Sequence, residues 1–297
     1  MEHLTATVSC FARAYHYKNN STRIFADGAA ELLLGKEYDR IAQSMSRGID
    51  FFLPKFQGSA EEGLRLIVDR QLSPSVLGRS AYCERMLENE KRLGCRQYVV
   101  FASGYDTYAV RNHDPSLSVF ELDLPEVLAD KQAKTENAGL RTAAIYVPCD
   151  LSDGAWKDRL LESGFRRGRK AFGSLLGISY YLEKSEFRDL LLTLGGILCE
   201  GSAICFDYPS EEDSRETRIN QALAHGAGEE MKARYVRREM EELLAECGFL
   251  IYGHLDHEEM TRQYFSAYNE CCPTHPMKAP KGVCYALAVR KDVHAKG

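Results

Sequence analysis

The amino-acid sequence predicts an α/β fold in which helices cover both faces of a doubly wound, parallel sheet. This prediction depends on a change in pattern near residue 95. Before that point apolar residues recur at helical spacing, and after it short apolar runs alternate with helical segments. Strands that alternate with crossover helices favour a parallel sheet covered on both faces. We therefore expect a helical cap over residues 1–94 and a core over 95–297, both parts of one domain.

The composition argues against several other classes of protein. The chain has 297 residues, of which 44% are hydrophobic and 27% charged, and its net charge is −5. These values are not those of a disordered chain, and they lack the basic excess of nucleic-acid-binding proteins. The longest apolar run, at 190–199, is shorter than the roughly 18 residues of a membrane span, and the first ten residues lack the pattern of a signal peptide. We expect a cytoplasmic protein with a small-molecule partner and neither nucleic acid nor membrane.

The helices of the cap follow from apolar spacing and from the residues at their ends. A helix at 29–35 ends on a glycine suited to a C-cap, and 61–72 carries apolar residues at helical spacing. Pro74 then separates this helix from another near 76–93.

After residue 95, short apolar runs predict strands and the segments between them predict helices. We expect strands at 97–102, 118–123, 143–148, 171–177, 202–208, 249–255 and 283–290. We expect helices near 125–137, 154–163, 184–194, 229–247 and 256–268. The charged insert at 209–240, after the fifth strand, either closes over a pocket as a lid or forms a solvated helical pair.

Three successive strands end in small or acidic residues, and open parallel sheets bind ligands beyond the carboxyl ends of their strands. Gly104 would let the backbone approach a ligand closely, and Ser103 adds little bulk. Glu121 and Asp123 lie on one side of the second strand, where a carboxylate can accept hydrogen bonds from both ribose hydroxyls. Asp150 lies just past the third strand. Together they predict a bound nucleoside, although each alone is also typical of a tight turn or a cap.

The cofactor that fits this pattern is a nucleoside without a pyrophosphate, because the G-x-G-x-x-G fingerprint is missing. S-adenosylmethionine meets that description. A nicotinamide-dependent oxidoreductase would need a pyrophosphate-binding glycine turn, and residues 98–107 contain a single glycine, so this alternative ranks last.

Five segments, in order, resemble the S-adenosylmethionine-dependent O-methyltransferases related to leucine carboxyl methyltransferase and to the polyketide carboxyl methyltransferase of tetracenomycin biosynthesis. FASGYDTYAVR is similar to that family's L-G-A-G-x-D-T-R-x-x-R, FELDLPEVLADKQ to F-E-V-D-x-P-x-V-x-x-x-K, and VPCDLSDGAW to V-x-x-D-L-x-x-x-W. Upstream, FARAYHYKNNSTRIFADGAAELLLG resembles the N-terminal R-A, L-F-x-D-P-x-A and L-L-G elements, and GRSAYCERML stands in the place of R-T-x-x-F-D-D. The resemblance implies a seven-stranded, Rossmann-like methyltransferase sheet with the helical cap and a lid.

The resemblance also implies how S-adenosylmethionine would be held and S-adenosylhomocysteine left as product. Gly104 would lie against the cofactor, Asp123 would hold the ribose hydroxyls, and Asp150 with the backbone at Leu151 would bind the adenine edge.

Two arginines are implied at the cofactor's carboxylate. Arg79 would clamp that group and Arg13 would close over it, and a planar guanidinium can bind a carboxylate through two hydrogen bonds. The alternative for each is a solvated surface arginine.

The chain departs from the family pattern near the expected methyl group. Leu176 stands where E-G-x-L-x-Y-L has glutamate, which removes a negative charge beside the sulfonium, and Ala102 replaces the first glycine of G-A-G. Tyr108 replaces the arginine of D-T-R. Asp207, at the end of the fifth strand, either restores the missing charge or is a plain strand-end acid.

The implied activity is methyl transfer to a carboxylate or hydroxyl of a small molecule, or to a peptide C-terminus. A carboxylate is ionised at neutral pH and needs no base, whereas a hydroxyl must lose its proton. His113, His254 and His257 lie at loops or strand ends without an evident partner, so no catalytic residue is assigned and a carboxyl acceptor is favoured. Aromatic residues near strand ends that could line the acceptor site are Tyr180, Tyr181 and Tyr208.

Other interpretations stay open at this point. A degenerate methyltransferase fold that binds a nucleoside or a partner without turnover would explain Leu176 and Ala102. We expect no metal, because Cys271 and Cys272 near His275 lack zinc spacing and a single H-x-x-H pair is a weak site. The other cysteines lie singly in apolar runs, which is typical of reduced, buried thiols. The sequence does not indicate an oligomeric state.

Overall fold

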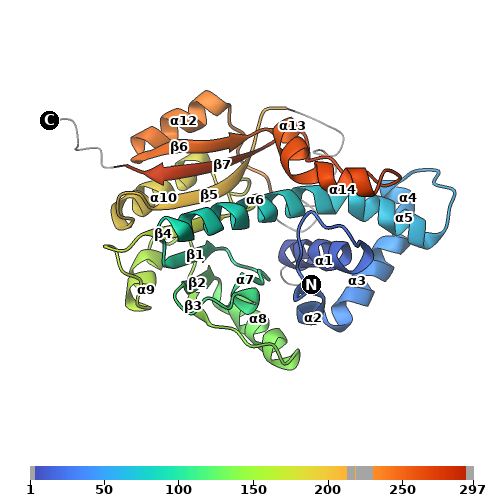
Figure 1. Cartoon of the computed structure of the whole chain (residues 1–297), viewed down its shortest axis with the longest axis horizontal. Coiled ribbons are helices and arrows are strands. Elements are labelled where there is room, and N and C mark those ends of the chain that lie inside the picture. The colour runs from blue at the N-terminus through green and yellow to red at the C-terminus, as the bar shows by residue number, and fades with distance from the viewer. Residues whose placement is uncertain (1–3, 213–217, 219–229, 292–297) are drawn as a thin grey trace.

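A computed structural model describes residues 4–212, 218 and 230–291, and it contains a seven-stranded sheet (Figure 1). The strand order is β3-β2-β1-β4-β5-β7-β6. All seven expected strands are confirmed: β1 Gln97–Phe101, β2 Ser118–Asp123, β3 Ala144–Pro148, β4 Ala171–Leu175, β5 Ala203–Pro209, β6 Phe249–Leu255 and β7 Val283–Arg290.

The expectation of a wholly parallel sheet is wrong at one strand. The pairs among β1 to β5 are parallel, but β7 pairs antiparallel with both β5 and β6. The helices α13 His257–Met260, η2 Thr261–Phe265 and α14 Ser266–Cys271 follow β6. The loop after them reaches the pocket at the carboxyl ends of the parallel strands. The chain is still at this edge of the sheet when β7 begins at Val283. β7 therefore starts at the carboxyl ends of the parallel strands and runs antiparallel to its neighbours.

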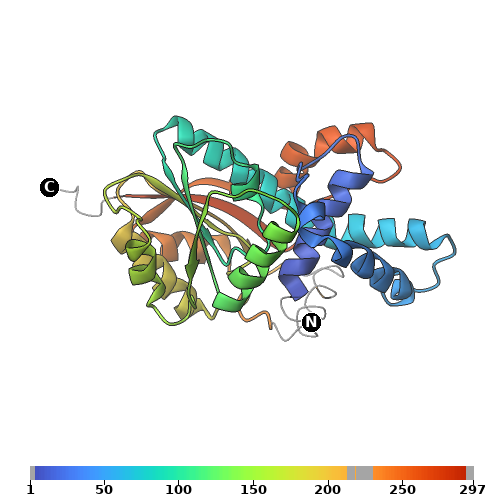
Figure 2. The ribbon, with the colours of Figure 1, turned by 90° about the horizontal axis from the view of Figure 1, so that it is seen from below.

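Helices cover both faces of the sheet, as expected, and β1 shows why. Val99 and Phe101 enter one apolar cluster, whereas Tyr98 and Val100 enter another, as the alternation of a strand requires. The first cluster contains side chains of α9 Trp156–Glu162, α10 Lys184–Ile197 and α12 Arg237–Glu246. The second contains side chains of α6 Ser73–Arg92 and of the helices after β6. Figure 2 shows these layers on either side of the strands.

A helical cap lies beside the carboxyl ends of the strands (Figures 1 and 2). It consists of α1 Leu4–Asn19, α2 Ala30–Leu34, α3 Lys36–Arg47, α4 Ile49–Phe52, α5 Ala60–Ile67 and the π-helical η1 Val68–Leu72. Gly35 ends α2 at φ +52° and donates to the carbonyl of Glu31, which confirms the predicted C-cap. The helices α1 and α3 are additional to those predicted from the sequence. Their apolar residues help to form a third buried cluster.

Pro74 was expected to separate two helices, but α5, η1 and α6 run on without a loop. Proline has no N–H and its ring presses on the carbonyl four residues earlier, so an α-helical ladder cannot pass through it unchanged. Here Pro74 lies in the first turn of α6, and the wider turns of η1 precede it. The proline therefore marks a change of helical pitch and not a gap.

The helix expected at 229–247 begins later than predicted. Residues 230–236 are irregular, and α12 starts at Arg237. The Lys232 amide donates to the Tyr180 carbonyl and the Tyr235 amide to that of Pro209, so this segment is fixed by backbone bonds beside β5. The remainder of the proposed lid at 209–240, namely 213–217 and 219–229, lies outside the described residues.

The helix α8 Pro125–Asn137 coincides with its predicted range. All ten cysteines are free thiols, and six of them are buried. Within the described ranges, no three potential metal ligands come together, and no helix there has the length and apolarity to cross a bilayer.

One carboxylate of the cap is buried at the junction of α5 and η1. Asp69 is 4% exposed, and its Oδ2 lies 3.3 Å from Nε of Arg65. Burial raises the pKa of Asp69 to about 6, although Arg65 acts in the opposite direction. The folded state therefore favours the protonated acid, and stability falls as pH rises from the unfolded value near 4 through about 6.

Asp69→Asn should raise the stability of the protein by about 1–2 kcal/mol at pH 7.5, because the variant removes a buried charge that desolvation disfavours. Arg65 keeps its hydrogen bond to Asn20 in the variant. Urea unfolding from pH 4 to 8 measures the effect, with the exposed Asp189→Asn as control. A gain that is equal at pH 4 and 7.5 would contradict the assignment.

Candidate functional site

A pocket of about 960 Å³ opens at the carboxyl ends of the parallel strands, under the cap. Nearly all of the residues predicted to bind the cofactor line it: Arg13, Arg79, Ser103, Gly104, Asp123, Asp150, Leu151 and Leu176. The topology explains this convergence, because strand ends that are far apart in sequence meet at one edge of a parallel sheet.

Glu121 is the predicted residue that the structure does not bring to the pocket. It lies one pleat before Asp123 and is 1% exposed, forming a buried ion pair with Lys131 of α8. The two-residue period correctly puts both acids on one side of β2, but α8 covers that side behind the strand tip. Glu121 therefore anchors α8 to the sheet and lies outside the pocket lining.

Asp123 joins the tips of β1 and β2. Its Oδ2 accepts a hydrogen bond from the Gly104 amide at 2.6 Å, and its Oδ1 accepts one from the Leu124 amide at 2.8 Å. The carboxylate remains half-buried on the pocket wall. A carboxylate at this strand tip suits the hydroxyls of a ribose in folds of this type.

Gly104 has two structural reasons to be glycine. Its φ is +47°, which side-chain-bearing residues rarely adopt, and a Cβ there would lie 3.0 Å from Cβ of Ala6 on α1. The cap therefore rests directly on this turn. Ser103 beside it is buried, and its Oγ has no hydrogen-bond partner among the described residues. A buried, unpartnered hydroxyl on a pocket wall is suited to a polar ligand atom.

Ala102 also has a positive φ, +46°. This position corresponds to the first glycine of the G-A-G pattern that the sequence resembles, and glycine adopts a positive φ without strain. Alanine in this conformation costs roughly 1–2 kcal/mol, because its Cβ crowds the following carbonyl. Alanine in place of glycine is therefore tolerated at the cost of backbone strain.

Asp150 and Leu151 follow β3 at the pocket wall. Oδ1 of Asp150 accepts from the Ser152 amide at 2.8 Å and from its hydroxyl at 2.7 Å. These bonds lower the pKa of Asp150, so the carboxylate is ionised at neutral pH. The turn fixes the backbone at Leu151, where the resemblance implies contact with adenine.

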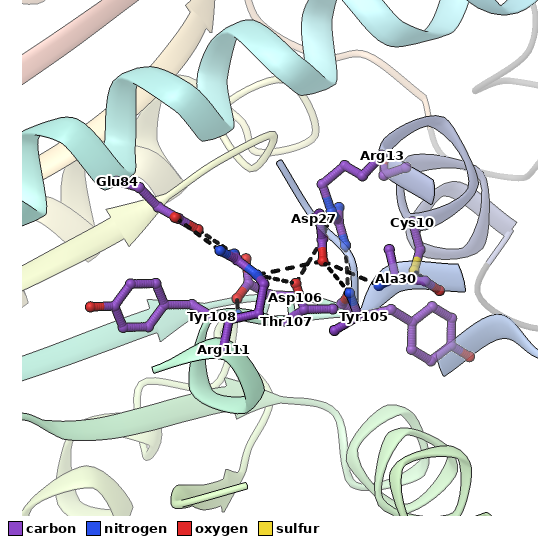
Figure 3. A network of polar contacts seen from close by, with 12 residues as sticks. Cys10, Arg13, Asp27, Ala30, Glu84, Tyr105, Asp106, Thr107, Tyr108 and Arg111 are labelled. Atoms are coloured by element: carbon purple, nitrogen blue, oxygen red, sulfur yellow. Dashed lines mark hydrogen bonds and ion pairs between the residues drawn. The ribbon is translucent and has the colours of Figure 1, made fainter. Parts of the chain in front are cut away.

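Asp27 lies at the centre of a polar network between the cap and the β1 turn (Figure 3). Its Oδ2 accepts from Nε of Arg13 at 2.8 Å and from the Thr107 hydroxyl at 2.7 Å. Its Oδ1 accepts from the amides of Ala29 and Ala30 at the start of α2 and lies 3.4 Å from Nε of Arg111. One buried carboxylate therefore joins α1, α2 and the segment after β1.

The network extends outward from Asp27 and defines the position of Arg13. Nη2 of Arg13 donates to the Tyr105 carbonyl at 2.7 Å, and Arg111 forms a two-point ion pair with Glu84 on α6. Arg13 lines the pocket but is buried and already paired, so it is not the solvated arginine of the alternative interpretation. Burial alone would raise the pKa of Asp27, but Arg13, Arg111 and the Thr107 hydroxyl together lower it.

Arg79 approaches the pocket from α6. Its Nη1 lies 3.6 Å from Oδ2 of Asp207, and its Nη2 donates to the Ser9 hydroxyl at 3.4 Å. The guanidinium lies against Gly177, where an added Cβ would be 2.7 Å from Nη1. Both polar contacts are long, so the planar fork can still bind a carboxylate.

Asp207 does not replace the charge lost at Leu176. It is fully buried and outside the pocket lining, and it accepts hydrogen bonds from the Gly177 amide at 2.7 Å and from the Tyr180 hydroxyl at 2.9 Å. Asp207 therefore orients the loop after β4, together with Arg79. Leu176 remains an apolar, half-buried part of the wall.

The other aromatic and histidine candidates differ in whether they line the pocket. Tyr180 and Tyr181 line the pocket, whereas Tyr208 is buried and bonded to Nε2 of His254 at 2.9 Å. Tyr108, in place of the family's arginine, packs edge-to-face on Tyr98 in the core. The histidines that the structure describes all lie outside the pocket lining: His16, His113, His254, His257 and His275.

This fold and strand-end site are those of an S-adenosylmethionine-dependent methyltransferase. The leucine carboxyl methyltransferase family model matches residues 6–195. The chain is 36% identical over 278 residues to YktD of Bacillus subtilis strain 168, covering 89% of this chain and 91% of that protein, whose name assigns it provisionally to the S-adenosyl-L-methionine-dependent methyltransferases. The chain therefore belongs to the leucine carboxyl methyltransferase family.

Further similarities agree with this assignment. A Frankia alni protein with the same provisional name is 35% identical over 136 residues, 45% of this chain and 48% of that protein. Among solved structures, a duf574 family protein from Streptomyces avermitilis has a TM-score of 0.60 at 15% identity, covering 96% of this chain and 97% of that one. A methyltransferase-like structure from Thermobifida fusca has a TM-score of 0.58 at 15% identity, covering 88% and 93%. These structures show the shared fold, and none of the comparisons supports the non-catalytic alternative.

Asp27→Asn should lower the free energy of unfolding by about 3 kcal/mol at pH 7, because it leaves the buried Arg13 guanidinium without its counter-charge and takes one of two carboxylate partners from the half-buried Arg111. The folded-state pKa of Asp27 is lowered, so its contribution is present above the unfolded pKa and is lost as pH falls below it. Urea unfolding at pH 7 and pH 3.5 tests both points. A loss below 0.5 kcal/mol at pH 7 would contradict the role.

Ala102→Gly should stabilise the protein by about 0.5–1 kcal/mol, because it relieves the left-handed strain but raises the entropy of the unfolded chain. Thermal unfolding measures the change. Ala133→Gly on the exposed side of α8 is the matched control and should destabilise by about 1 kcal/mol. The same sign for both variants would show that Ala102 is not strained.

Proposed function

We propose that this protein transfers the methyl group of S-adenosylmethionine to a carboxylate oxygen of a small molecule. The observation that carries the carboxylate assignment is the lining beside β4 and β5: it presents cationic side chains and no histidine among the described residues. The cations are Lys232, Arg234 and Lys281, of which Lys232 also lies 3.8 Å from Oε2 of Glu186.

The residues present fit the cofactor. The Asp123 carboxylate lies at the tip of β2 on the pocket wall, where it suits ribose hydroxyls, and the unpartnered Ser103 hydroxyl suits another polar atom of the ligand. Arg79 offers its fork to the carboxylate of the methionine portion, while Arg13 keeps the cap closed on the turn. We assign the nucleoside to the wall over β1 to β3 and the acceptor to the wall over β4 and β5.

When bound, the cofactor supplies an electrophilic methyl group on a sulfonium. The protein then has to place an acceptor oxygen in line and exclude water, since no enzyme nucleophile is needed. Lys232, Arg234 and Lys281 would hold an anionic acceptor at this wall. Leu176 adds no competing negative charge there.

A hydroxyl acceptor fits less well because it requires a base. Burial and the neighbouring Asp207 raise the pKa of Tyr180 well above its ordinary value, and its hydroxyl donates to Asp207. Tyr180 therefore stays protonated at neutral pH and cannot accept a proton. A carboxylate acceptor arrives ionised and avoids this requirement.

Asp123→Ala should weaken binding of S-adenosylmethionine and S-adenosylhomocysteine at least 10-fold, because hydrogen bonds to a charged group contribute about 1.5–3 kcal/mol. Titration calorimetry measures the affinity, and the exposed Asp158→Ala is the control. Unchanged affinity in a folded Asp123→Ala protein would contradict the site.

The reaction itself is tested by incubating the protein with cofactor and a panel of carboxylic acids, phenols and alcohols. Methyl esters are expected, and alkali should hydrolyse them to methanol. Alkali-stable methyl ethers as the main products would contradict the carboxylate assignment while leaving the cofactor site intact.

A further inference from the structure

The pocket extends from the wall over β1 to β3 onto the cap, where its lining becomes apolar. Four half-buried apolar side chains face it from three helices: Leu4 and Val8 on α1, Met45 on α3 and Phe52 on α4. At the base of this wall are the buried Leu72 and Val76 from the junction of η1 and α6. We call these six residues the cap wall.

The cap wall is the side of the cap's hydrophobic core that borders the pocket: Leu72 and Val76 belong to that buried cluster, and Val8 and Met45 pack against it. On α1, Phe11 and Tyr15 lie in the buried cluster of the cap, whereas Leu4 and Val8 also line the pocket. A helix whose second face met only water would carry polar residues there. The neighbouring Phe51 and Phe52 illustrate the distinction, because Phe51 is 63% exposed and outside the lining whereas Phe52 is inside it.

Cationic side chains line another part of the same pocket. Lys232 and Arg234 come from the backbone-fixed segment beside β5, and Lys281 comes from the loop before β7. One continuous cavity therefore has an apolar wall on the cap and cations beside β4 and β5. A volume of about 960 Å³ is at the upper end of the roughly 300–1,000 Å³ of small-molecule sites, which is consistent with two ligands.

Building on the proposed function, we propose that the methyl acceptor is an amphipathic carboxylic acid, with an extended acyl body along the cap wall and its carboxylate beside the cations. A carboxylate oxygen forms the new bond to the methyl carbon as the carbon–sulfur bond breaks, and its electron pair stays on the sulfur. An anionic acid and a cationic cofactor give a neutral methyl ester and S-adenosylhomocysteine, and no proton moves. The ester has lost the charge that the cations attract.

The test is a series of straight-chain carboxylic acids with 4 to 14 carbons, assayed for methyl ester. If each added CH2 is buried on the cap wall, kcat/KM should rise up to about 4-fold per CH2, the equivalent of 0.8 kcal/mol, until the wall is filled. Phe52→Ala should reduce kcat/KM at least 5-fold for the longer acids and leave the 4-carbon acid unchanged. Because the Phe51 ring packs edge-to-face on Phe52, the matched control is Leu32→Ala on α2, which is 55% exposed and outside the lining and should leave both unchanged.

The outcomes separate this inference from the proposed function. Cofactor affinity, measured by calorimetry, should be the same in both variants. If no acid is methylated although the cofactor binds, the proposed carboxylate acceptor is wrong. If esters form at rates that do not depend on chain length, or if Phe52→Ala and Leu32→Ala behave alike, the amphipathic acceptor is overturned. Met45→Ala, with the same expected pattern, replaces Phe52→Ala if that variant does not fold.

Discussion

The site depends above all on the buried carboxylate of Asp27. It is the common partner of two guanidinium groups, a threonine hydroxyl and two amides at a helix start, and these groups come from the cap and from the segment after β1. Such a charge is costly to bury unless it is fully paired. The pairing can be completed only when α1, α2 and the β1 turn have their present relative positions, so Asp27 defines how the cap sits on the sheet.

The β1 turn itself has little freedom once the cap is in place. Gly104 must leave room for Ala6, and its amide must reach Asp123 at the tip of the next strand. Ala102, two residues earlier, accepts a left-handed backbone to keep the turn in shape. Polar pairing on one side and close packing on the other together fix the wall against which we place the nucleoside.

Much of this architecture could be predicted from the sequence, because the signals are local. Short apolar runs indicated all seven strands, and the strand tips indicated the wall that carries Gly104, Asp123 and Asp150. The direction of β7 could not be predicted, since it depends on where the chain travels after α14.

The partners of the buried charges could not be predicted from the sequence either. Glu121 and Asp123 look alike in a strand of period two, and only the position of Lys131 on α8 separates them. Asp27, Thr107 and Arg111 lie in the segments that resemble the family, yet their contacts join parts of the chain about 80 residues apart. The one signal that could have identified them is that Asp27 and Arg111 occupy acidic and basic positions of those two motifs.

The unbroken course of α5, η1 and α6 has a consequence for how this protein can change over evolution. From Ala60 to Arg92 the chain is one helical rod that begins in the cap and ends against the sheet, with Pro74 inside it. A domain that is exchanged as a unit usually has a flexible linker at its border, where few contacts cross. Here the border lies inside a helix whose side chains belong to both the cap cluster and the sheet cluster. The cap can therefore diversify by substitution on its inner wall, but it cannot readily be replaced as a cassette.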